Sequence, residues 1–204
     1  MDRRSRYLQV ALALFLERGF NGVSMDQLVA AAGGSKATLY RYFDSKEALF
    51  EAIIDDIAAP AVPASDEEDW SAVALDQGLR ILGQATAAAA LDQRTIHLMQ
   101  LAIGEHARFP QLGQSLFERG PARTYARLRA FIAAKVKAGD IAVRDPQIAA
   151  EQFLGGIIGH QQMRMALGLP PPSQAEIAAR IEAAVQAFIA TYRTSGAGTA
   201  DDDR

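Results

Sequence analysis

The stretch Ser35-Lys36-Ala37-Thr38-Leu39-Tyr40-Arg41-Tyr42-Phe43 decides the fold of this chain. Its first residue, Ser35, can cap the free backbone N–H groups at the start of a helix, which we expect to run to about residue 42. Leu39 and Phe43, four positions apart, supply one buried side, while the other positions carry hydrogen-bond donors and aromatic rings. A purely structural helix of two turns has no need of so many donors, so the pattern favours a binding role.

A second short helix is expected directly before this one. Ser24-Met25-Asp26-Gln27 has the pattern of a capping box, in which the Ser24 hydroxyl and the Gln27 amide satisfy free backbone groups, and the helix is expected to end at Ala32. Gly33-Gly34 then permits a tight turn through positive φ. Two short helices joined by a glycine turn can set the second helix into the major groove of DNA while the first braces it. The same spacing also occurs in proteins that never touch DNA, so the side chains of residues 35–43 carry the inference.

Further helices are expected on both sides of this pair. Upstream, a stripe at helical spacing ends at Gly19, a natural C-terminal stop, and consists of Leu8, Ala11, Leu12 and Phe15. Downstream, Asp44-Ser45-Lys46-Glu47 offers an Asp-x-x-Glu capping box for the next helix. Lys46 would lie in the first turn, where its charge opposes the helix dipole and gains nothing locally, whereas the same terminus attracts a phosphate. We therefore predict that Lys46 contacts a phosphate.

These residues resemble the N-terminal region of the TetR (tetracycline repressor) family of bacterial regulators. The resemblance covers Tyr7 to about Ile54 and rests on an ordered set of motifs: Phe20-x-x-Val23-Ser24-Met25, Leu28-Val29, Ala31-Ala32-Gly33, Thr38-Leu39-Tyr40-Arg41-Tyr42-Phe43 and Ser45-Lys46-Glu47-Ala48-Leu49. Two positions depart from the family pattern, because Gly34 stands where an apolar residue is common and Ala37 stands where glycine is frequent. Both departures concern the packing of the turn and the approach of the helix after it.

The resemblance implies an all-helical homodimer with one helix-turn-helix per subunit and a divergent C-terminal domain that usually binds a small effector. It implies phosphate contacts by Ser24, Ser35, Tyr40, Tyr42 and Lys46. It implies base-facing positions at Lys36, Ala37 and Thr38. Without the resemblance, either tyrosine would as readily belong to the core, and Lys46 would belong to solvent.

The rest of the chain is predicted to be helical as well, because apolar residues recur at three- and four-residue steps without sustained alternation. The expected helices cover residues 70–89, 92–108, 119–138, 146–167 and 173–192, and their separators are Pro110, Gly139-Asp140 and Pro170-Pro171-Pro172. Pro60, Pro63 and the acidic residues 66–69 mark a seam. We expect an all-α fold of about nine helices. It would consist of a three-helix helix-turn-helix DNA-binding domain at residues 1–58, a helical bundle for effector binding and dimerisation at 59–193, and a disordered tail at 194–204.

The C-terminal bundle holds candidates for two kinds of contact. Gly155, Gly156 and Gly159 lower helix propensity, which makes sense if another helix approaches their backbone. In similar proteins the last two long helices of each subunit form the dimer interface, and the segment from Gln152 resembles the C-terminal domain of one TetR subfamily. The predicted interface residues are Phe153, Gly156, Ile157, His160, Ile181, Val185 and Phe188; the alternative is that these faces pack within one subunit. The predicted effector contacts are His97, Gln100, Phe117 and Tyr125, although such residues are more often core or solvated than ligand-binding.

Composition and spacing exclude several other kinds of site. The chain has no cysteine, which excludes disulfides and thiolate metal sites and fits a cytoplasmic location. His97 and His106 lie nine residues apart, on opposite faces of one helix, and so cannot share a metal. The glycines of residues 155–159 lack the preceding strand of a dinucleotide site. The apolar run at residues 7–16 is too short to span a bilayer and has no cleavage site. We therefore expect no metal, no cofactor, no enzymatic activity and no membrane association.

Charge is distributed unevenly along the chain. Residues 1–50 carry seven Lys or Arg and five acidic residues, a net charge of +2, although the whole chain carries −3. So small an excess supports a phosphate-binding face only if the basic side chains converge in space.

The leading hypothesis is a ligand-responsive repressor whose dimer binds a palindromic operator in double-stranded DNA and is released by a small-molecule effector. Its two recognition helices would enter half-sites about one turn of DNA (~34–36 Å) apart. Two alternatives stay open. A structural or adaptor bundle would make the donors between Lys36 and Lys46 coincidental, and a cofactorless all-α enzyme would require the acid–base or nucleophile pair that the chain lacks.

Overall fold

The computed structural model describes residues 2–58, 70 and 72–194. The predicted seam at Pro60, Pro63 and residues 66–69 and the predicted tail from residue 195 onward lie outside the described residues. Over the described ranges the regular structure is helical apart from one isolated antiparallel bridge between Ile141 and Arg193, which confirms the all-α prediction. Packing separates two compact units. Unit 1 contains described residues from 1–64, 88–124 and 161–171, and unit 2 those from 65–87, 125–160 and 172–204.

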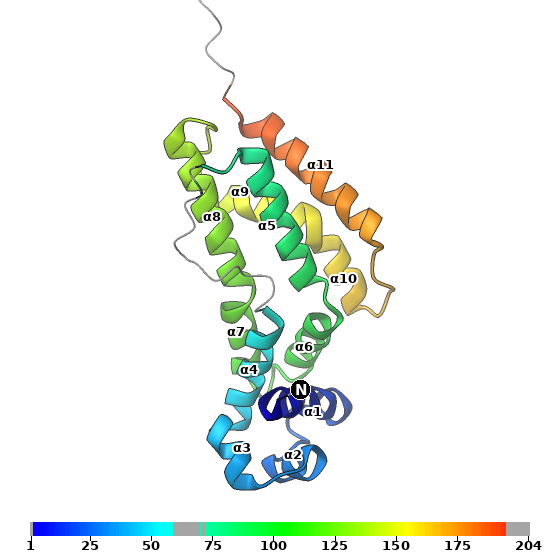
Figure 1. Ribbon diagram of the computed structural model, residues 1–204. Helices are drawn as coiled ribbons and strands as arrows, with labels where there is room; N and C mark the ends of the chain where they lie inside the picture. Colours follow the sequence, from blue (N-terminus) through cyan, green and yellow to red (C-terminus); the bar gives the residue numbers. More distant parts are fainter. Residues whose placement is uncertain (1, 59–69, 71, 195–204) are drawn as a thin grey trace, which may run out of the picture. The chain divides into compact units, whose positions relative to one another are not determined.

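Unit 1 begins with four helices, drawn from blue to cyan in Figure 1. They are α1 (Arg3–Arg18), α2 (Met25–Ala32), α3 (Lys36–Tyr42) and α4 (Lys46–Ala58). The side chain of Asp2 caps α1 by accepting from the Ser5 backbone N–H at 2.7 Å. The helix ends at Arg18, and Gly19 follows it with a φ of 72°, an angle that glycine adopts without strain, so the expected stop is confirmed. Both α2 and α4 pack against α1.

The start of α4 differs in detail from the prediction. A capping box was expected from Asp44, but the Ser45 hydroxyl accepts the hydrogen bond from the Ala48 backbone N–H at 3.0 Å. Because α4 begins at Lys46, Ser45 occupies the position just before the helix, where a side-chain oxygen reaches the free N–H groups.

The next helices of unit 1 are α6 (Gln93–Gly104) and α7 (Pro110–Arg119). The helix predicted over 92–108 is shorter in the structure, and Pro110 does not separate two helices but begins α7, which the sequence does not predict. Proline instead occupies the first turn of α7, where its missing N–H costs nothing and its fixed φ suits the helix. The Arg119 guanidinium ties α7 to α4 through Glu51 at 2.5 Å and Asp55 at 2.6 Å.

The core of unit 1 centres on the fully buried Phe20, in the connection between α1 and α2. Its ring centroid lies 5.1 Å from that of Phe15, 6.0 Å from that of Phe50 and 5.1 Å from that of Phe109. Offset and edge-on pairs of this kind stabilise beyond the area that they bury. Residues of α1, of α4 and of the segment after α6 therefore meet on one side chain.

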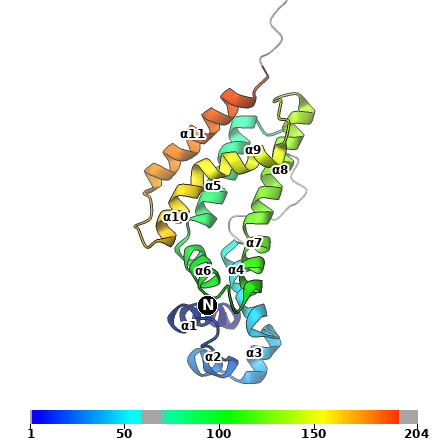
Figure 2. The same cartoon turned by 180° about the vertical axis from the view of Figure 1, so that it is seen from behind.

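Unit 2 contains α5 (Leu75–Ala90) as far as residue 87, α8 (Pro121–Ala138) from residue 125, α9 (Pro146–Leu154), η2 (Gly155–Gly159) and α11 (Gln174–Tyr192). Figure 2 shows α9 crossing in front of α5. The helix predicted over 146–167 is interrupted, because η2 has π-helical geometry before α10 (His160–Ala166) resumes. One-turn π segments of this kind insert an extra residue into the helix and are frequent at functional sites.

The core of unit 2 is held by close contacts around two glycines of α5. A Cβ on Gly83 would lie 3.2 Å from Ile157, 3.4 Å from Ile181 and 3.5 Å from Phe153. A Cβ on Gly78 would lie 2.3 Å from the Phe131 ring, so α5 approaches α8 closely there. Any larger residue at 78 would displace that ring.

Candidate nucleic-acid interface

The turn between α2 and α3 is built as the sequence predicts. The Ser24 hydroxyl accepts from the Gln27 backbone N–H at 3.2 Å, and the Gln27 side chain accepts from the Ser24 backbone N–H at 2.7 Å. The backbone then passes through positive φ at Gly33 (75°) and Gly34 (111°). The capping box and the glycine turn are therefore both confirmed, and they set the two ends of α2.

The departure at Gly34 has a structural reason in the Tyr7 side chain of α1. The Tyr7 hydroxyl donates to the Gly33 carbonyl oxygen at 3.3 Å, and a Cβ at position 34 would lie 2.8 Å from that hydroxyl. Tyr7 also packs against Tyr42, with ring centroids 6.3 Å apart. Sequence reasoning missed this role of Tyr7, because its partners lie more than twenty-five residues away in the chain.

Helix α3 presents a polar face and buries an apolar one. Leu39 and Phe43 are buried, as predicted for the anchor. Tyr40 is 46% exposed and Tyr42 is 38% exposed, so neither tyrosine belongs to the core. The other exposed positions of this helix are Lys36, Ala37 and Arg41, and Thr38 is half-buried.

Ser35 begins α3 with a hydroxyl in two contacts. Its oxygen accepts from the Thr38 backbone N–H at 3.2 Å and lies 3.0 Å from the Thr38 hydroxyl. Each hydroxyl has one proton and two lone pairs, so one O–H of the pair is free to donate outward. The cap and a contact to a phosphate or a base are therefore chemically compatible.

Lys36 carries the exposed positive charge at the start of α3. Its ammonium lies 2.6 Å from the Asp26 carboxylate of α2, and both side chains are exposed. The hydrogen bond to Asp26 and the attraction between the two charges raise the pKa of Lys36, which keeps it protonated. An ion pair in water is easily exchanged for another partner, so the Lys36 side chain can leave Asp26 for a nucleic acid.

Lys46 has local partners that the sequence did not reveal. Its ammonium donates to the carbonyl oxygens of Phe20 at 2.7 Å and Val23 at 2.9 Å, and it lies 4.4 Å from the centroid of the Phe20 ring. Burial lowers its pKa, while the charges of Glu47 and Glu105 act in the opposite direction. The expectation that this charge gains nothing locally was wrong, and the ammonium holds the connection between α1 and α2.

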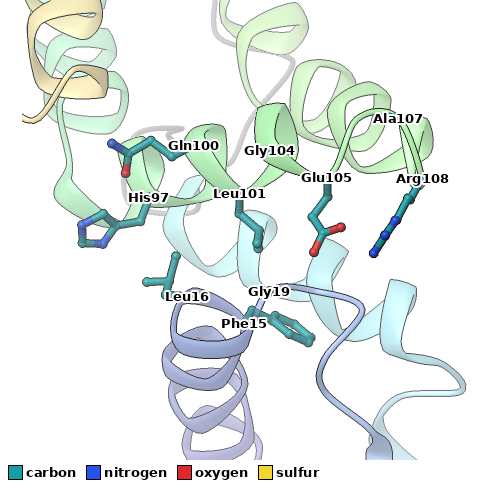
Figure 3. A pocket seen from close by; sticks show the side chains of 10 residues that line it. All are labelled: Phe15, Leu16, Gly19, His97, Gln100, Leu101, Gly104, Glu105, Ala107 and Arg108. Carbon is teal, nitrogen blue, oxygen red and sulfur yellow. The ribbon is translucent and has the colours of Figure 1, made fainter.

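Two of the four predicted effector residues line one hollow of unit 1. His97 and Gln100 line a hollow of about 650 Å³ in unit 1, between α1 and α6, as Figure 3 shows. Its apolar surface comes from Phe15, Leu16 and Leu101, and its charged end from Glu105 and Arg108. Phe117 of α7 does not line this hollow and is 56% exposed. Tyr125 belongs to unit 2, where burial raises the pKa of its hydroxyl.

The predicted interface residues divide into two groups. Five of them are buried inside unit 2, and these are Phe153, Ile157, Ile181, Val185 and Phe188. The rings of Phe153 and Phe188 meet edge to face, with centroids 5.8 Å apart. Packing within one chain therefore accounts for this stripe. Gly156 and His160 are exposed, and a Cβ on Gly155, Gly156 or Gly159 would meet nothing within 4 Å.

Two family models match the chain. Residues 8–53 match the bacterial regulatory proteins of the tetR family, and residues 77–194 match the C-terminal domain of AefR-like transcriptional repressors. The second match alone spans more than half of the chain. This chain belongs to the TetR family. It is therefore a DNA-binding transcriptional regulator, in a family whose members are regulators and not enzymes.

Relatives and solved structures agree with this assignment. An HTH-type transcriptional regulator of Mycobacterium tuberculosis (strain H37Rv) is 49% identical over 49 residues, which is 24% of either chain, so the chain matches about a quarter of that relative's length. The flavonoid-responsive regulator FrrA is 32% identical with a TM-score of 0.75, over 95% of this chain and 98% of that one. A TetR regulator from Agrobacterium tumefaciens is 29% identical with a TM-score of 0.74, over 95% of both chains.

Two further observations concern the described residues alone. No three His, Cys, Asp or Glu side chains within them are grouped as a metal site would require. None of the helices described combines the length and the apolar character needed to cross a membrane.

Proposed function

We propose that this TetR regulator is a cytoplasmic repressor that binds a palindromic operator as a homodimer and is released by a small-molecule effector. The observation that carries the proposal is the exposed polar face of α3. That face stands on a helix whose start is fixed by the Ser35 cap and whose opposite side is anchored by the buried Leu39. A helix that is rigidly held and polar on its free side is suited to enter a major groove.

We assign phosphate contacts to Ser24, Ser35, Tyr40, Tyr42 and Lys46, and base contacts to Lys36, Ala37 and Thr38. The hydroxyls of the two exposed tyrosines and the O–H of each capping serine can donate to phosphate oxygens. Lys46 donates two N–H groups to carbonyl oxygens, so an ammonium with three donors retains one for a phosphate. Its partial burial favours a positioning contact over a strong attraction from a distance.

In the proposed homodimer, a second copy of the chain would pack against the exposed surface around Gly156 and His160. Glycine weakens a helix, and no contact among the residues that the structure describes uses the space above Gly155, Gly156 or Gly159. The approach of a partner's helix would explain why the space is kept open.

The dimer can be tested with one variant and a matched control. Gly156→Arg fits the isolated chain, because no described residue lies within 4 Å of a Cβ at this position, but it would block a partner subunit. Gly113→Arg on α7 is the control, since a Cβ there also meets nothing within 4 Å. Sedimentation velocity should show a monomer for Gly156→Arg and a dimer for wild type and Gly113→Arg. A dimeric Gly156→Arg protein would refute this interface.

The hollow between α1 and α6 is our candidate effector site. It offers an apolar floor with the polar groups of His97 and Gln100 at one end and of Glu105 and Arg108 at the other. Since FrrA is named as flavonoid-responsive and resembles the chain over nearly its full length, planar polyphenols are the class to test first. His97→Ala should weaken binding of such a ligand in titration calorimetry, and Phe117→Ala should not.

Selection from randomised duplex DNA tests the operator. Wild-type protein should retain a palindromic site, and a ligand that binds the chain should release it. Recovery of only salt-titratable, sequence-indifferent duplex would refute the proposal.

A further inference from the structure

Residues 19–24 connect α1 to α2, so the position of this connection determines where α2 begins. Its backbone is tightly built: Gly19 has a φ of 72° and a ψ of 164°, a conformation that is almost confined to glycine. A Cβ on Gly22 would lie 2.2 Å from the Arg18 carbonyl oxygen. Ser24, at the end of the connection, caps α2. A displacement of the connection would therefore move the start of α2.

The first hold on this connection comes from α4. The Lys46 ammonium donates to the carbonyl oxygens of Phe20 and Val23, at 2.7 Å and 2.9 Å. These carbonyls lie on either side of the Asn21-Gly22 peptide, so the lysine fixes both ends of the tightest part of the connection.

The second hold comes from Glu105, directly after α6. Its Oε1 atom accepts a hydrogen bond from the Asn21 backbone N–H at 3.4 Å. The same atom would lie 2.7 Å from a Cβ at position 19, so only glycine leaves room for the carboxylate. Figure 3 shows the Glu105 side chain directed from the end of α6 toward Gly19. The connection thus donates one N–H group to the Glu105 carboxylate, and two of its carbonyl oxygens accept hydrogen bonds from Lys46.

We infer that Glu105 is a positioning residue for DNA binding: by holding the Asn21 amide it fixes the α1–α2 connection, and with it the placement of α2 and α3. The inference rests on DNA binding by those two helices. Glu105 and Gly19 also line the hollow between α1 and α6, so a molecule bound there would lie against the same contact.

The direction in which the DNA affinity of a Glu105 variant changes distinguishes a positioning role from electrostatic repulsion between the carboxylate and DNA phosphates. Removing an acidic side chain near a DNA-binding surface weakens repulsion of phosphates and should strengthen binding. Removing a positioning carboxylate should weaken it. Glu17 provides a matched control, because it is an exposed acid on α1 whose partner is the neighbouring Arg18.

The experiment compares Glu105→Ala, Glu105→Gln and Glu17→Ala with wild type. For the duplex selected by wild type, Glu105→Ala should bind about five-fold more weakly, the factor expected for one net hydrogen bond, with an unchanged salt slope. Glu105→Gln keeps the accepting oxygen and should restore binding to within about two-fold. Glu17→Ala should bind at least as well as wild type.

Amide hydrogen exchange, followed by NMR, supplies a readout that general destabilisation would not reproduce. Exchange at Asn21 should accelerate in Glu105→Ala and stay near the wild-type rate in Glu105→Gln, while amides in the middle of α1 and α4 keep their protection. Unchanged Asn21 exchange, or acceleration throughout unit 1, would overturn the inference. If wild type selects no operator, the proposed repressor function fails, and Asn21 exchange still decides whether Glu105 holds the connection.

Discussion

Replacement of Gly19 by alanine gives a sharp test of the backbone at the α1–α2 connection. The φ and ψ angles of Gly19 are 72° and 164°, which places any L-residue under strain of about 1–3 kcal/mol. Gly33 has nearly the same angles, 75° and 157°, but a Cβ there meets nothing within 4 Å. Gly33→Ala therefore measures the backbone strain alone.

The structure predicts similar stabilities for the two variants and different local behaviour. Each should lower the free energy of unfolding by about 2 kcal/mol. The extra clash in Gly19→Ala is with the end of the Glu105 side chain, which can rotate away, so the two losses should agree to within ~0.5 kcal/mol. Rotation removes the carboxylate from Asn21, so only Gly19→Ala should accelerate exchange of the Asn21 amide.

Urea unfolding followed by circular dichroism measures the first quantity, and amide exchange measures the second. A Gly33→Ala protein as stable as wild type would refute the assignment of strain. A loss for Gly19→Ala that exceeded the loss for Gly33→Ala by ~2 kcal/mol would refute the statement that the carboxylate yields. Equal Asn21 exchange in both variants would refute the contact itself.

Three further outcomes are expected. Ser24→Ala should lower the free energy of unfolding by about 1 kcal/mol in urea, since it removes a capping hydroxyl; no change would exclude the cap. Lys46→Ala should reduce the salt slope of operator binding by about one unit if the ammonium meets a phosphate; an unchanged slope would leave it only the carbonyl contacts. Hydrogen bonds from the Arg80 guanidinium and Gln186 lower the pKa of Glu182 from its usual 4.5 to about 2. The ionised Glu182 therefore stabilises the folded state above pH 4.5, and this stabilisation disappears as the pH falls toward 2. Thermal unfolding of Glu182→Gln should accordingly vary less over that range than wild type, and equal profiles would exclude the effect.

Features governed by neighbours in the chain could be predicted from the sequence. The capping box at Ser24 and Gln27 and the stop at Gly19 depend on residues within four positions of one another. The same is true of the Ser35 cap and its Thr38 partner. Short-range spacing carries this information because a helix terminus has free N–H or C=O groups only within its own first or last turn.

Features that depend on distant partners could not be predicted. Glu105 lies 84 positions from Asn21, and Lys46 lies 26 positions from Phe20, so no local pattern marks either contact. Pro110 shows a second kind of failure, since proline both separates helices and begins them, and only packing decides between the two.

The role of the apolar stripe that includes Val185 could not be decided from the sequence, for a third reason. Helical spacing tells that a face is buried but not which chain buries it. Here α9 and η2 of the same unit pack against α11, and Ile181 of α11 also approaches Gly83 of α5. Predictions for the dimer therefore depend on the glycines of η2 and on His160. These residues are exposed in the structure, and their spacing in the sequence does not show whether they are exposed or buried.

The ion pair between Lys36 and Asp26 has a consequence for how the regulator searches a genome. Asp26 is a tethered anion, so its local concentration beside Lys36 does not fall when the protein meets DNA or when salt is diluted. A phosphate that makes one loose contact must compete with this resident carboxylate. A site that engages the whole face of α3 at once can outcompete it. We therefore expect the Asp26 carboxylate to weaken binding to bulk DNA more than binding to the operator, which would sharpen the contrast between the two.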